Sequence, residues 1–259
     1  MWIDPLTGKL IHKEPAPSDV DIVSIMPLKG KVGQPIQPLL LIDSNKGLHV
    51  LPSGSADLKE SAGKFFHYEV DTVAQVVQGF VVGHGDVKPQ KLIPLWNMEL
   101  GSVGERILAS ATPEHREWAH VPVHIKGDAS ILYKYINPNM LTVVSEDDKG
   151  NLNLYALDAV TGHVLHQSLI PGGAGPVHVV ACDNWIVLHY RNAKRTRFEI
   201  LVTEFFQAKA DEGPWDILFP GKQANRTKSA HHLEMPVPLQ QSYVFPAGVT
   251  SMGVTATLK

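Results

Sequence analysis

Histidines are the residues that most invite a chemical interpretation, because the sequence contains 13 of them in 259 residues. A zinc site needs imidazoles or thiolates at spacings that place them on one face, and the sequence contains neither HExxH nor CxxC. The adjacent His231 and His232 would point to opposite sides of an extended segment. His84 lies in a Gly-His-Gly-Asp stretch that favours a turn. We therefore predict no metal site.

The segment from Asp147 to Asp158 imitates a calcium-binding loop. It offers side-chain oxygens at Asp147, Asn151 and Asn153 and ends on an acid at the twelfth place. However, Leu152 stands where such a loop needs glycine, and Lys149 would bring a positive charge towards the ion. The segment is better interpreted as the turn of a β-hairpin.

Nucleophilic catalysis would need an activated serine or cysteine near a base. Ser53-Gly54-Ser55 lacks the GxSxG frame, and Cys182, the single cysteine, lies in an apolar segment that we predict to be a buried strand. The glycine-rich stretch 172–175 lacks the Lys and Ser/Thr of a phosphate-binding loop and precedes Pro176, so we predict a turn between repeated units. We predict no catalytic residue, no cofactor and no enzymatic activity.

Asn225-Arg226-Thr227 is a canonical acceptor sequence for N-linked glycosylation. It lies in a polar stretch that an oligosaccharyltransferase could reach if the chain entered the endoplasmic reticulum. Asn225 is therefore a candidate glycosylation site and favours a luminal location.

Charge and hydropathy exclude several classes of partner. The formal net charge is −3, from 23 basic and 26 acidic residues, so no broad cationic field favours nucleic acid or an anionic membrane. No stretch approaches the roughly 20 apolar residues that span a bilayer, and the first residues do not form a signal peptide.

The apolar runs are short, rich in Val, Ile and Leu, and separated by Gly, Pro, Asn and Asp. This pattern is typical of strands and turns, so we predict an all-β fold. Three segments read as strand, turn and strand of similar design: 39–42 with 48–51, 140–145 with 152–157, and 185–190 with 197–202.

A sequence motif that occurs twice predicts a repeated architecture. The DxxTG frame of residues 4–8 returns at residues 158–162. Its Asp and Thr can bond local backbone groups while Gly takes the left-handed conformation between the two outer strands of a propeller blade. Blades of about 40 to 50 residues would place about three or four blades between the two copies. Asp43 follows Asp4 by about one blade, although its turn lacks the Thr.

Two stretches interrupt the strand pattern. Residues 99–121 are polar and are predicted as a short helix or an extended surface loop. Residues 207–238 are predicted as a long polar insertion between strands.

From about residue 128 onward, several segments resemble the conserved luminal region of the family of ER membrane protein complex subunit 1. The most specific are ILYKYINPN (131–139) and LQQSYVFP (239–246), and they are accompanied in order by DAVTGHVLH (158–166), GPVH (175–178) and NWIVLHYRNAKRTRFEI (184–200). The resemblance covers roughly half of the chain. Residues 1–127 match the preceding blades of the family more loosely.

The resemblance implies a partial luminal β-propeller of quinoprotein-like blades, each of four antiparallel strands, over residues 1–259. It implies a non-catalytic scaffold at the luminal side of the endoplasmic reticulum membrane, in a complex that inserts tail-anchored and multipass proteins. The implied partners are the other subunits and transmembrane clients, and the family's C-terminal membrane anchor is absent from this chain. Its strand edges, if uncovered, would favour aggregation.

Two other functions stay open. The DxxTG echo also occurs in quinoprotein dehydrogenases, which bind pyrroloquinoline quinone and calcium, but the five tryptophans (Trp2, Trp96, Trp118, Trp185 and Trp215) lack the regular docking pattern of that family. A stand-alone propeller that binds other proteins is the second alternative. In LQQSYVFP, Tyr243 and Phe245 alternate with Val244 along an expected strand, and we predict core packing for them rather than partner contact.

Overall fold

The computed structural model describes most of the chain as antiparallel β-sheets. The described residues are 1–4, 6–15, 17–28, 36–56, 58, 63, 65–83, 90–113, 123–127, 131–207 and 235–255. They form two compact units, which are Met1–Glu69 with Gln78–Asn97, and Val70–Val77 with Met98–Lys259. The predicted all-β class is confirmed, since the described elements comprise strands and one 3₁₀ turn, Gly101–Val103.

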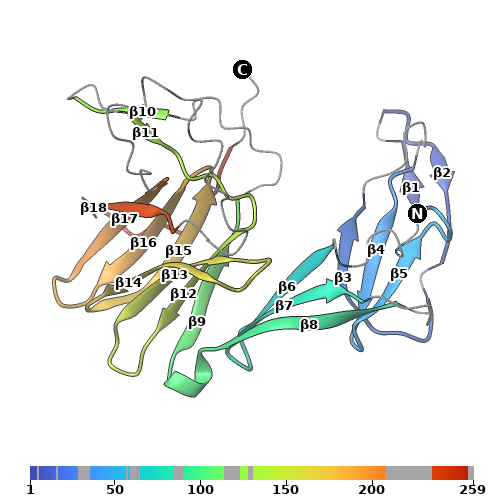
Figure 1. Ribbon diagram of the computed structural model, residues 1–259, viewed down its shortest axis with the longest axis horizontal. Coiled ribbons are helices and arrows are strands. Elements are labelled where there is room, and N and C mark those ends of the chain that lie inside the picture. Colours follow the sequence, from blue (N-terminus) through green and yellow to red (C-terminus); the bar gives the residue numbers. More distant parts are fainter. Residues whose placement is uncertain are drawn as a thin grey trace, which may run out of the picture. The chain divides into compact units, whose positions relative to one another are not determined.

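The second unit contains a four-stranded sheet (Figure 1). Its two central strands carry apolar side chains on both faces. Nearly every side chain of the central strands is buried, and the predicted hairpin between them is confirmed over seven residue pairs. A strand with apolar side chains on both faces is stable at the centre of a sheet, because other layers can then cover both faces. The sheet order is β14-β13-β12-β9, with β9 at Arg106–Ala111, β12 at Met140–Glu146, β13 at Leu152–Asp158 and β14 at Val164–Ile170.

A second four-stranded sheet follows directly in the chain. The hairpin predicted for residues 185–202 is confirmed as its two central strands. The connection from the first sheet to the second consists of residues 171 and 172, and Gly172 has a φ of 71°. The turn predicted for 172–175 is therefore confirmed for Gly172, whereas residues 173–175 begin β15. The sheet order is β15-β16-β17-β18, with β15 at Gly173–Cys182, β16 at Trp185–Asn192, β17 at Arg197–Phe206 and β18 at Val237–Phe245.

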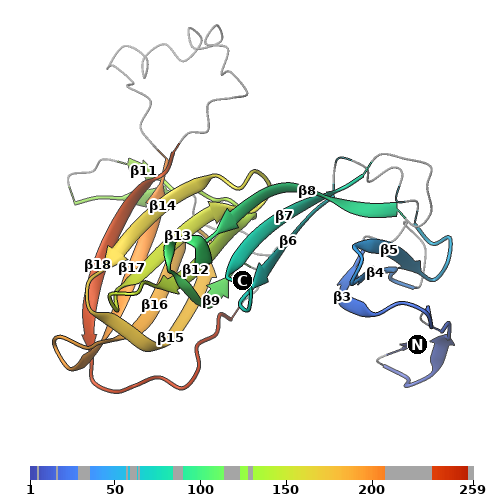
Figure 2. The ribbon, with the colours of Figure 1, turned by 90° about the horizontal axis from the view of Figure 1, so that it is seen from below.

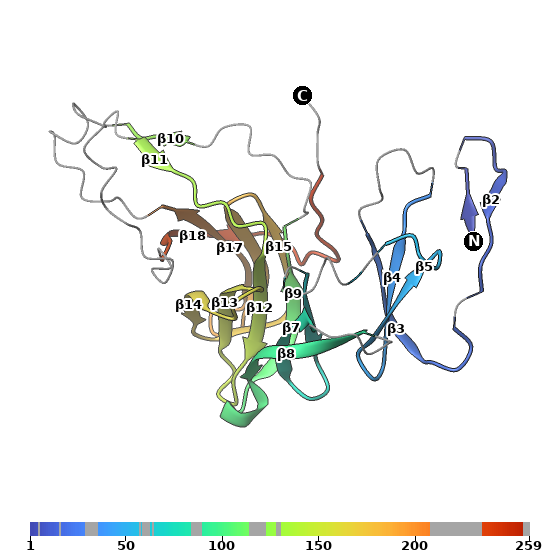
Figure 3. The ribbon, with the colours of Figure 1, turned by 45° about the vertical axis from the view of Figure 1, so that its right-hand side comes forward.

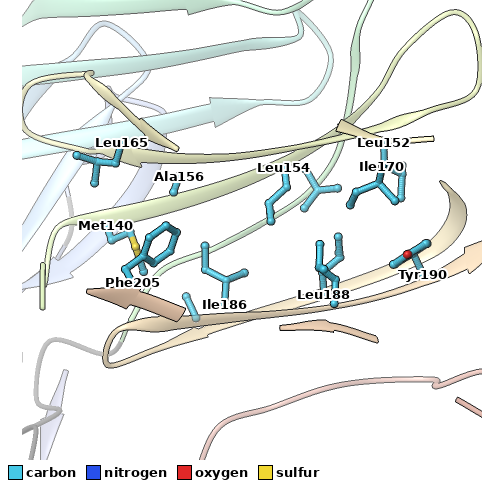
Figure 4. Packing of buried hydrophobic residues seen from close by; sticks show 13 residues of the cluster. Met140, Leu152, Leu154, Ala156, Leu165, Ile170, Ile186, Leu188, Tyr190 and Phe205 are labelled. Carbon is cyan, nitrogen blue, oxygen red and sulfur yellow. The ribbon is translucent and has the colours of Figure 1, made fainter. Parts of the chain in front are cut away.

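The two sheets pack face to face over one apolar layer. Figure 4 shows side chains of β12–β14 pointing towards side chains of β16 and β17. Face-to-face sheets lie about 10 Å apart, a gap that Leu, Ile and Phe side chains fill. The buried cluster comprises Met140, Val144, Leu152, Leu154, Ala156, Leu165 and Ile170 from the first sheet, and Ala181, Ile186, Leu188, Tyr190, Leu201 and Phe205 from the second.

The arrangement of these sheets is that of consecutive propeller blades. Each is a meander of four antiparallel strands, and the first strands of the two sheets, β9 and β15, contact each other (Figure 3). A small hairpin is inserted between β9 and β12, formed by β10 at Val123–Ile125 and β11 at Ile131–Tyr133. The prediction of four-stranded blades is confirmed for these two sheets.

The first unit departs from the four-stranded pattern. Its main sheet has six strands in the order β3-β4-β5-β8-β7-β6, because β5 also pairs with β8 through Gly47 and Leu48. The predicted hairpin at residues 39–51 is confirmed as β4 and β5. The strands are β1 at Trp2–Ile3, β2 at Leu10–His12, β3 at Ile22–Pro27, β4 at Leu39–Asp43, β5 at Gly47–Leu51, β6 at Phe66–Asp71, β7 at Val76–Val82 and β8 at Gln90–Glu99.

The DxxTG echo corresponds to one turn that occurs twice. In both copies the Gly amide donates to the Asp carbonyl, at 2.8 Å for Gly8 and 2.7 Å for Gly162. The Asp carboxylate of each copy also accepts from the Thr hydroxyl. Both glycines have positive φ, 69° and 73°. The second copy joins β13 and β14, the last two strands of their sheet in chain order, as predicted for a propeller blade, and β14 is the edge strand.

The left-handed glycine makes this turn sensitive to a side chain. We expect Gly162→Ala to lower the free energy of unfolding by about 1 to 2 kcal/mol, because a Cβ is unfavourable at a φ of 73°. Urea titration followed by circular dichroism would measure it. Gly253→Ala is the control, since a Cβ at Gly253 meets nothing within 4 Å and the backbone is not left-handed. Equal stability of the two variants would contradict the prediction.

The structure corrects the expectation for residues 99–121. Apart from the 3₁₀ turn, residues 106–111 form β9, the first strand of a blade, rather than a helix or a surface loop. β9 pairs with β12, which follows it by about 30 residues, and Ile107 is buried. Residues 114–121 lie outside the described residues.

The predicted insertion falls between strands that pair with each other. β17 ends at Phe206 and β18 begins at Val237, so the last two residues of the predicted insertion, Val237 and Pro238, already belong to β18. Residues 208–234 lie outside the described residues.

Candidate functional site

We call the sheet of β9 and β12–β14 the first blade and the sheet of β15–β18 the second blade. The first blade covers one face of the second blade, and the opposite face is only partly buried. Along β17, Glu199, Leu201, Thr203 and Phe205 are buried on the side of the first blade. The alternate residues Phe198, Ile200, Val202 and Glu204 are half-buried, and the last one, Phe206, is buried beside His124 of β10. Successive side chains of a strand point to opposite faces. The half-buried set therefore marks the face turned away from the first blade, which we call the open face.

The strand register identifies the other members of the open face. Directly opposed residues of antiparallel strands lie on the same face, so each partner of Ile200 and Val202 belongs to it. His189 and Tyr243 flank Ile200, while Val187 and Gln241 flank Val202. The apolar members of the open face are Val180, Trp185, Val187, Phe198, Ile200, Val202, Phe206, Val237, Leu239, Tyr243 and Phe245.

The central strands of the first blade are buried on both faces. All residues of β12 and β13 except the last of each strand are buried, including the side turned away from the second blade, where Leu141, Val143 and Leu157 are 0–1% exposed. The side chains of the open face are also mostly apolar, but most of them are only partly buried. An apolar sheet face of this size is typical of a surface that another layer covers.

An aromatic cluster closes one end of the open face. The His189 ring stacks on Phe198 at 5.4 Å between ring centres and meets the edge of Phe245 at 6.0 Å. Gly248 lies so close to Phe198 that a Cβ there would be 3.0 Å from the ring. Burial lowers the pKa of His189, so this imidazole is neutral at pH 7. Figure 2 shows the chain leaving β18 in red at this end.

The outer strands of the two blades are joined by one glutamine. Gln240 of β18 lies on the face turned towards the first blade and contacts Ser168 of β14 at 3.2 Å and the His166 ring at 3.1 Å. Its amide also donates to Thr203 at 3.0 Å. These contacts fix the position of β18 against its neighbours.

A buried acid lies between the two blades. Glu199 is 2% exposed and accepts from Tyr190 at 2.7 Å, Asn192 at 3.1 Å and Arg197 at 2.7 Å. Burial by itself would raise the pKa of Glu199, but the hydrogen bonds outweigh it and lower the pKa to about 2. Burial and the neighbouring carboxylate raise the pKa of Tyr190 to about 12. The network satisfies a buried charge and presents no reactive group to solvent.

The first unit has an acid and a histidine in contact. Asp43 accepts from the amides of Asn45 and Gly47 and lies 2.9 Å from Nε2 of His49. The hydrogen bond with His49, followed by these amides, lowers the pKa of Asp43. Since the carboxylate holds the β4–β5 turn, we assign it a structural role.

The residues weighed for chemistry have structural surroundings where they are described. Asp147 accepts from the amides of Lys149 and Asn151 in the β12–β13 turn, which confirms the hairpin interpretation. Ser53 donates to Glu14 at 2.5 Å. Cys182 is half-buried at the end of β15, not within a fully buried strand as predicted, because its side chain lies on the open face.

Several predicted positions cannot be placed. His84, His231, His232, Asn225, Trp118 and Trp215 lie outside the described residues, so the glycosylation site stays a prediction. In the part of the chain that the structure describes, no three His, Cys, Asp or Glu side chains are grouped to hold a metal ion. Within that same part, no helix is long and apolar enough to cross a membrane.

The interpretation of Tyr243 and Phe245 as core residues is wrong for Tyr243. Its side chain is 49% exposed, and most of β18 is exposed with it. Phe245 is half-buried in the aromatic cluster. Strand alternation identified the shared face correctly, but β18 is the last strand of its sheet and, among the described residues, no other sheet covers Tyr243. The sequence signal for this site was present in β17, where Phe198, Ile200 and Val202 alternate with the buried set.

Comparison with known proteins identifies the family. The family model described as ER membrane protein complex subunit 1, second beta-propeller, matches residues 1–259. This chain belongs to that family. Proteins named ER membrane protein complex subunit 1 are similar to it at 29% identity in Xenopus laevis, 31% in Gallus gallus and 26% in Schizosaccharomyces pombe. The alignments cover 98%, 85% and 77% of this chain.

Membership of the subunit 1 family confirms the resemblance seen in the C-terminal half and extends it over the whole chain. It also confirms the β-propeller fold class. The chain spans about a quarter of the length of these relatives, at 25%, 22% and 21% of each.

Proposed function

We propose that this chain is part of a luminal scaffold in the ER membrane protein complex. The observation that carries the proposal is the match of the family model over residues 1–259, because the relatives' printed names describe a subunit of that complex. In this role the propeller is not a catalyst. It holds other subunits in place while the complex inserts tail-anchored and multipass proteins into the endoplasmic reticulum membrane.

The geometry of the second blade supports a scaffold. Its buried acid is neutralised by Arg197 and hydrogen bonds, and its surface offers an open apolar face rather than convergent reactive groups. A propeller presents loops and strand edges to partners without needing a reactive pocket. We propose that a further blade of the full-length protein covers the open face, as the second blade covers the first.

The domain assignment extends the same proposal. Residues 1–127 would supply the preceding blades and also β9, the first strand of the blade that β12–β14 complete, and residues 128–259 would be the conserved part of one luminal propeller region. The full-length protein would be held at the membrane by an anchor outside these residues, as the resemblance implies.

The test is affinity purification of the epitope-tagged full-length protein from detergent-solubilised membranes, followed by mass spectrometry. Recovery of the other complex subunits in near-equal amounts is the expected result. Recovery of the protein alone from a soluble fraction would overturn the proposal and favour a stand-alone propeller. Stoichiometric calcium and a quinone in the purified protein would instead favour the dehydrogenase alternative.

A further inference from the structure

The outer edge of the second blade is a long and regular strand. β18 is the last strand of its sheet and pairs with β17 over nine consecutive residues without a bulge. No other strand among the described residues pairs with its second edge. Such an edge presents backbone N–H and C=O groups that another strand can bind.

The side chains of β18 leave this edge almost unprotected. Exposed edges usually carry charged residues, prolines or bulges, which prevent pairing with other chains. β18 contains no Asp, Glu, Lys or Arg, although 19% of the chain is charged. One protective residue, Pro238, stands near its first end. Four of its apolar side chains are 46–59% exposed, namely Val237, Leu239, Tyr243 and Val244.

Two other outer strands, β3 and β14, are less suited to pairing. β3, at the edge of the six-stranded sheet, has an irregular register after Ile22 and ends in Pro27. β14 has a register shift at its pairing with Leu157. β18, by contrast, pairs in a regular register. Its conformation is stabilised by the hydrogen bonds of Gln240 and by the contact of Phe245 with His189. A preformed edge binds with a smaller loss of conformational entropy.

We infer that β18 binds an uncharged β-strand of another protein subunit by strand addition. Nine residues of strand extend about 30 Å, long enough for a specific backbone-paired contact. Because β18 carries no charge, its complement should alternate apolar and uncharged polar residues, since an unpaired charge buried there is unfavourable. Assembly with a different subunit, rather than a second copy, follows from membership of a complex and therefore rests on the proposed function.

The experiment places a photo-crosslinking residue on the edge in the full-length protein. Val244 is replaced by p-benzoylphenylalanine, and the tagged protein is irradiated in membranes, purified and analysed by mass spectrometry. We expect a crosslink to another subunit, within a peptide that contains at least about five consecutive residues without Asp, Glu, Lys or Arg. The same replacement at Ala193, exposed in the β16–β17 turn of the same blade, is the control and should not give this crosslink.

A charged residue on the edge should prevent the subunit that crosslinks to position 244 from being recovered with this protein. Val244→Lys is expected to lower its recovery at least roughly tenfold, whereas Val244→Thr, which keeps a β-branched uncharged residue, should retain it. Val103→Lys adds a lysine at another exposed apolar position, 66% exposed, and should also retain it. Equal resistance to limited proteolysis would show that Val244→Lys is folded.

The outcomes separate this inference from the proposed function. If the complex is recovered but Val244 crosslinks to a second copy, to lipid or within its own chain, the strand-addition inference is wrong and the scaffold proposal stands. Full recovery of every subunit with Val244→Lys would also overturn the inference. If no complex subunit is recovered with the unmodified protein, the proposed function itself fails.

Discussion

Phe205→Ala is expected to lower the free energy of unfolding by about 3 to 5 kcal/mol. Phe205 is 0% exposed in the layer between the two blades and packs edge-on against the His166 ring, with 5.7 Å between ring centres. The large loss arises because both blades lose contacts at once and the rigid strands cannot close the cavity. Urea titration followed by circular dichroism would measure the change.

Leu169→Ala is the matched control for that substitution. Leu169 is apolar but 56% exposed on β14, so its truncation should change the free energy of unfolding by less than about 0.5 kcal/mol. Similar losses for the two variants would mean that the layer between the blades does not dominate stability. The m value is the slope of the unfolding free energy against urea concentration, and an m value equal to that of the wild type would show that both variants unfold to the same state.

Glu199→Gln should lower the free energy of unfolding at pH 7 by about 2 kcal/mol, because Arg197 and Tyr190 lose a charged acceptor. The pKa of Glu199 is lowered from 4.5 to about 2 in the folded protein. Its ionised form therefore stabilises the fold above pH 4.5, and this contribution is lost as the pH falls from 4.5 towards 2. The difference between the wild type and Glu199→Gln should shrink over that range.

Urea titrations at pH 7 and pH 3 would test both parts of this prediction. Asp148→Asn changes an exposed acid in the β12–β13 turn and should alter stability by less than about 0.5 kcal/mol at pH 7. A Glu199→Gln variant as stable as the wild type at pH 7, or a difference that grows at pH 3, would contradict the assignment of Glu199 as a stabilising anion.

Local patterns were sufficient to predict the hairpins. The strands around Asp147–Asn151 are apolar runs joined by a short turn, so neighbouring residues in the sequence determine their pairing. The DxxTG turn was predictable for the same reason, since its hydrogen bonds join residues at most five apart. The resemblance supplied the propeller class, which periodicity alone would not distinguish from other sheet architectures.

Features that depend on distant residues were not predictable. β9 was missed because its short sequence, RILASA, follows the polar Glu105 and pairs with a strand that lies beyond the β10–β11 hairpin. The candidate site was missed for a related reason. Alternation in LQQSYVFP shows that Tyr243 and Phe245 share a face, but whether another layer covers that face depends on residues outside the strand.

The separation of β17 from β18 also affects the order in which the second blade forms. Residues 207–236 lie between these paired strands, whereas β16 and β17 are joined by a turn of four residues, 193–196. Loop-closure entropy increases slowly with loop length, so the longer connection adds little to the equilibrium cost of pairing, but non-local contacts form later in folding. During synthesis, β15, β16 and β17 can associate before β18 has emerged from the ribosome. The outer edge is consequently completed last, and a subunit that recognises it would bind only blades whose folding has finished.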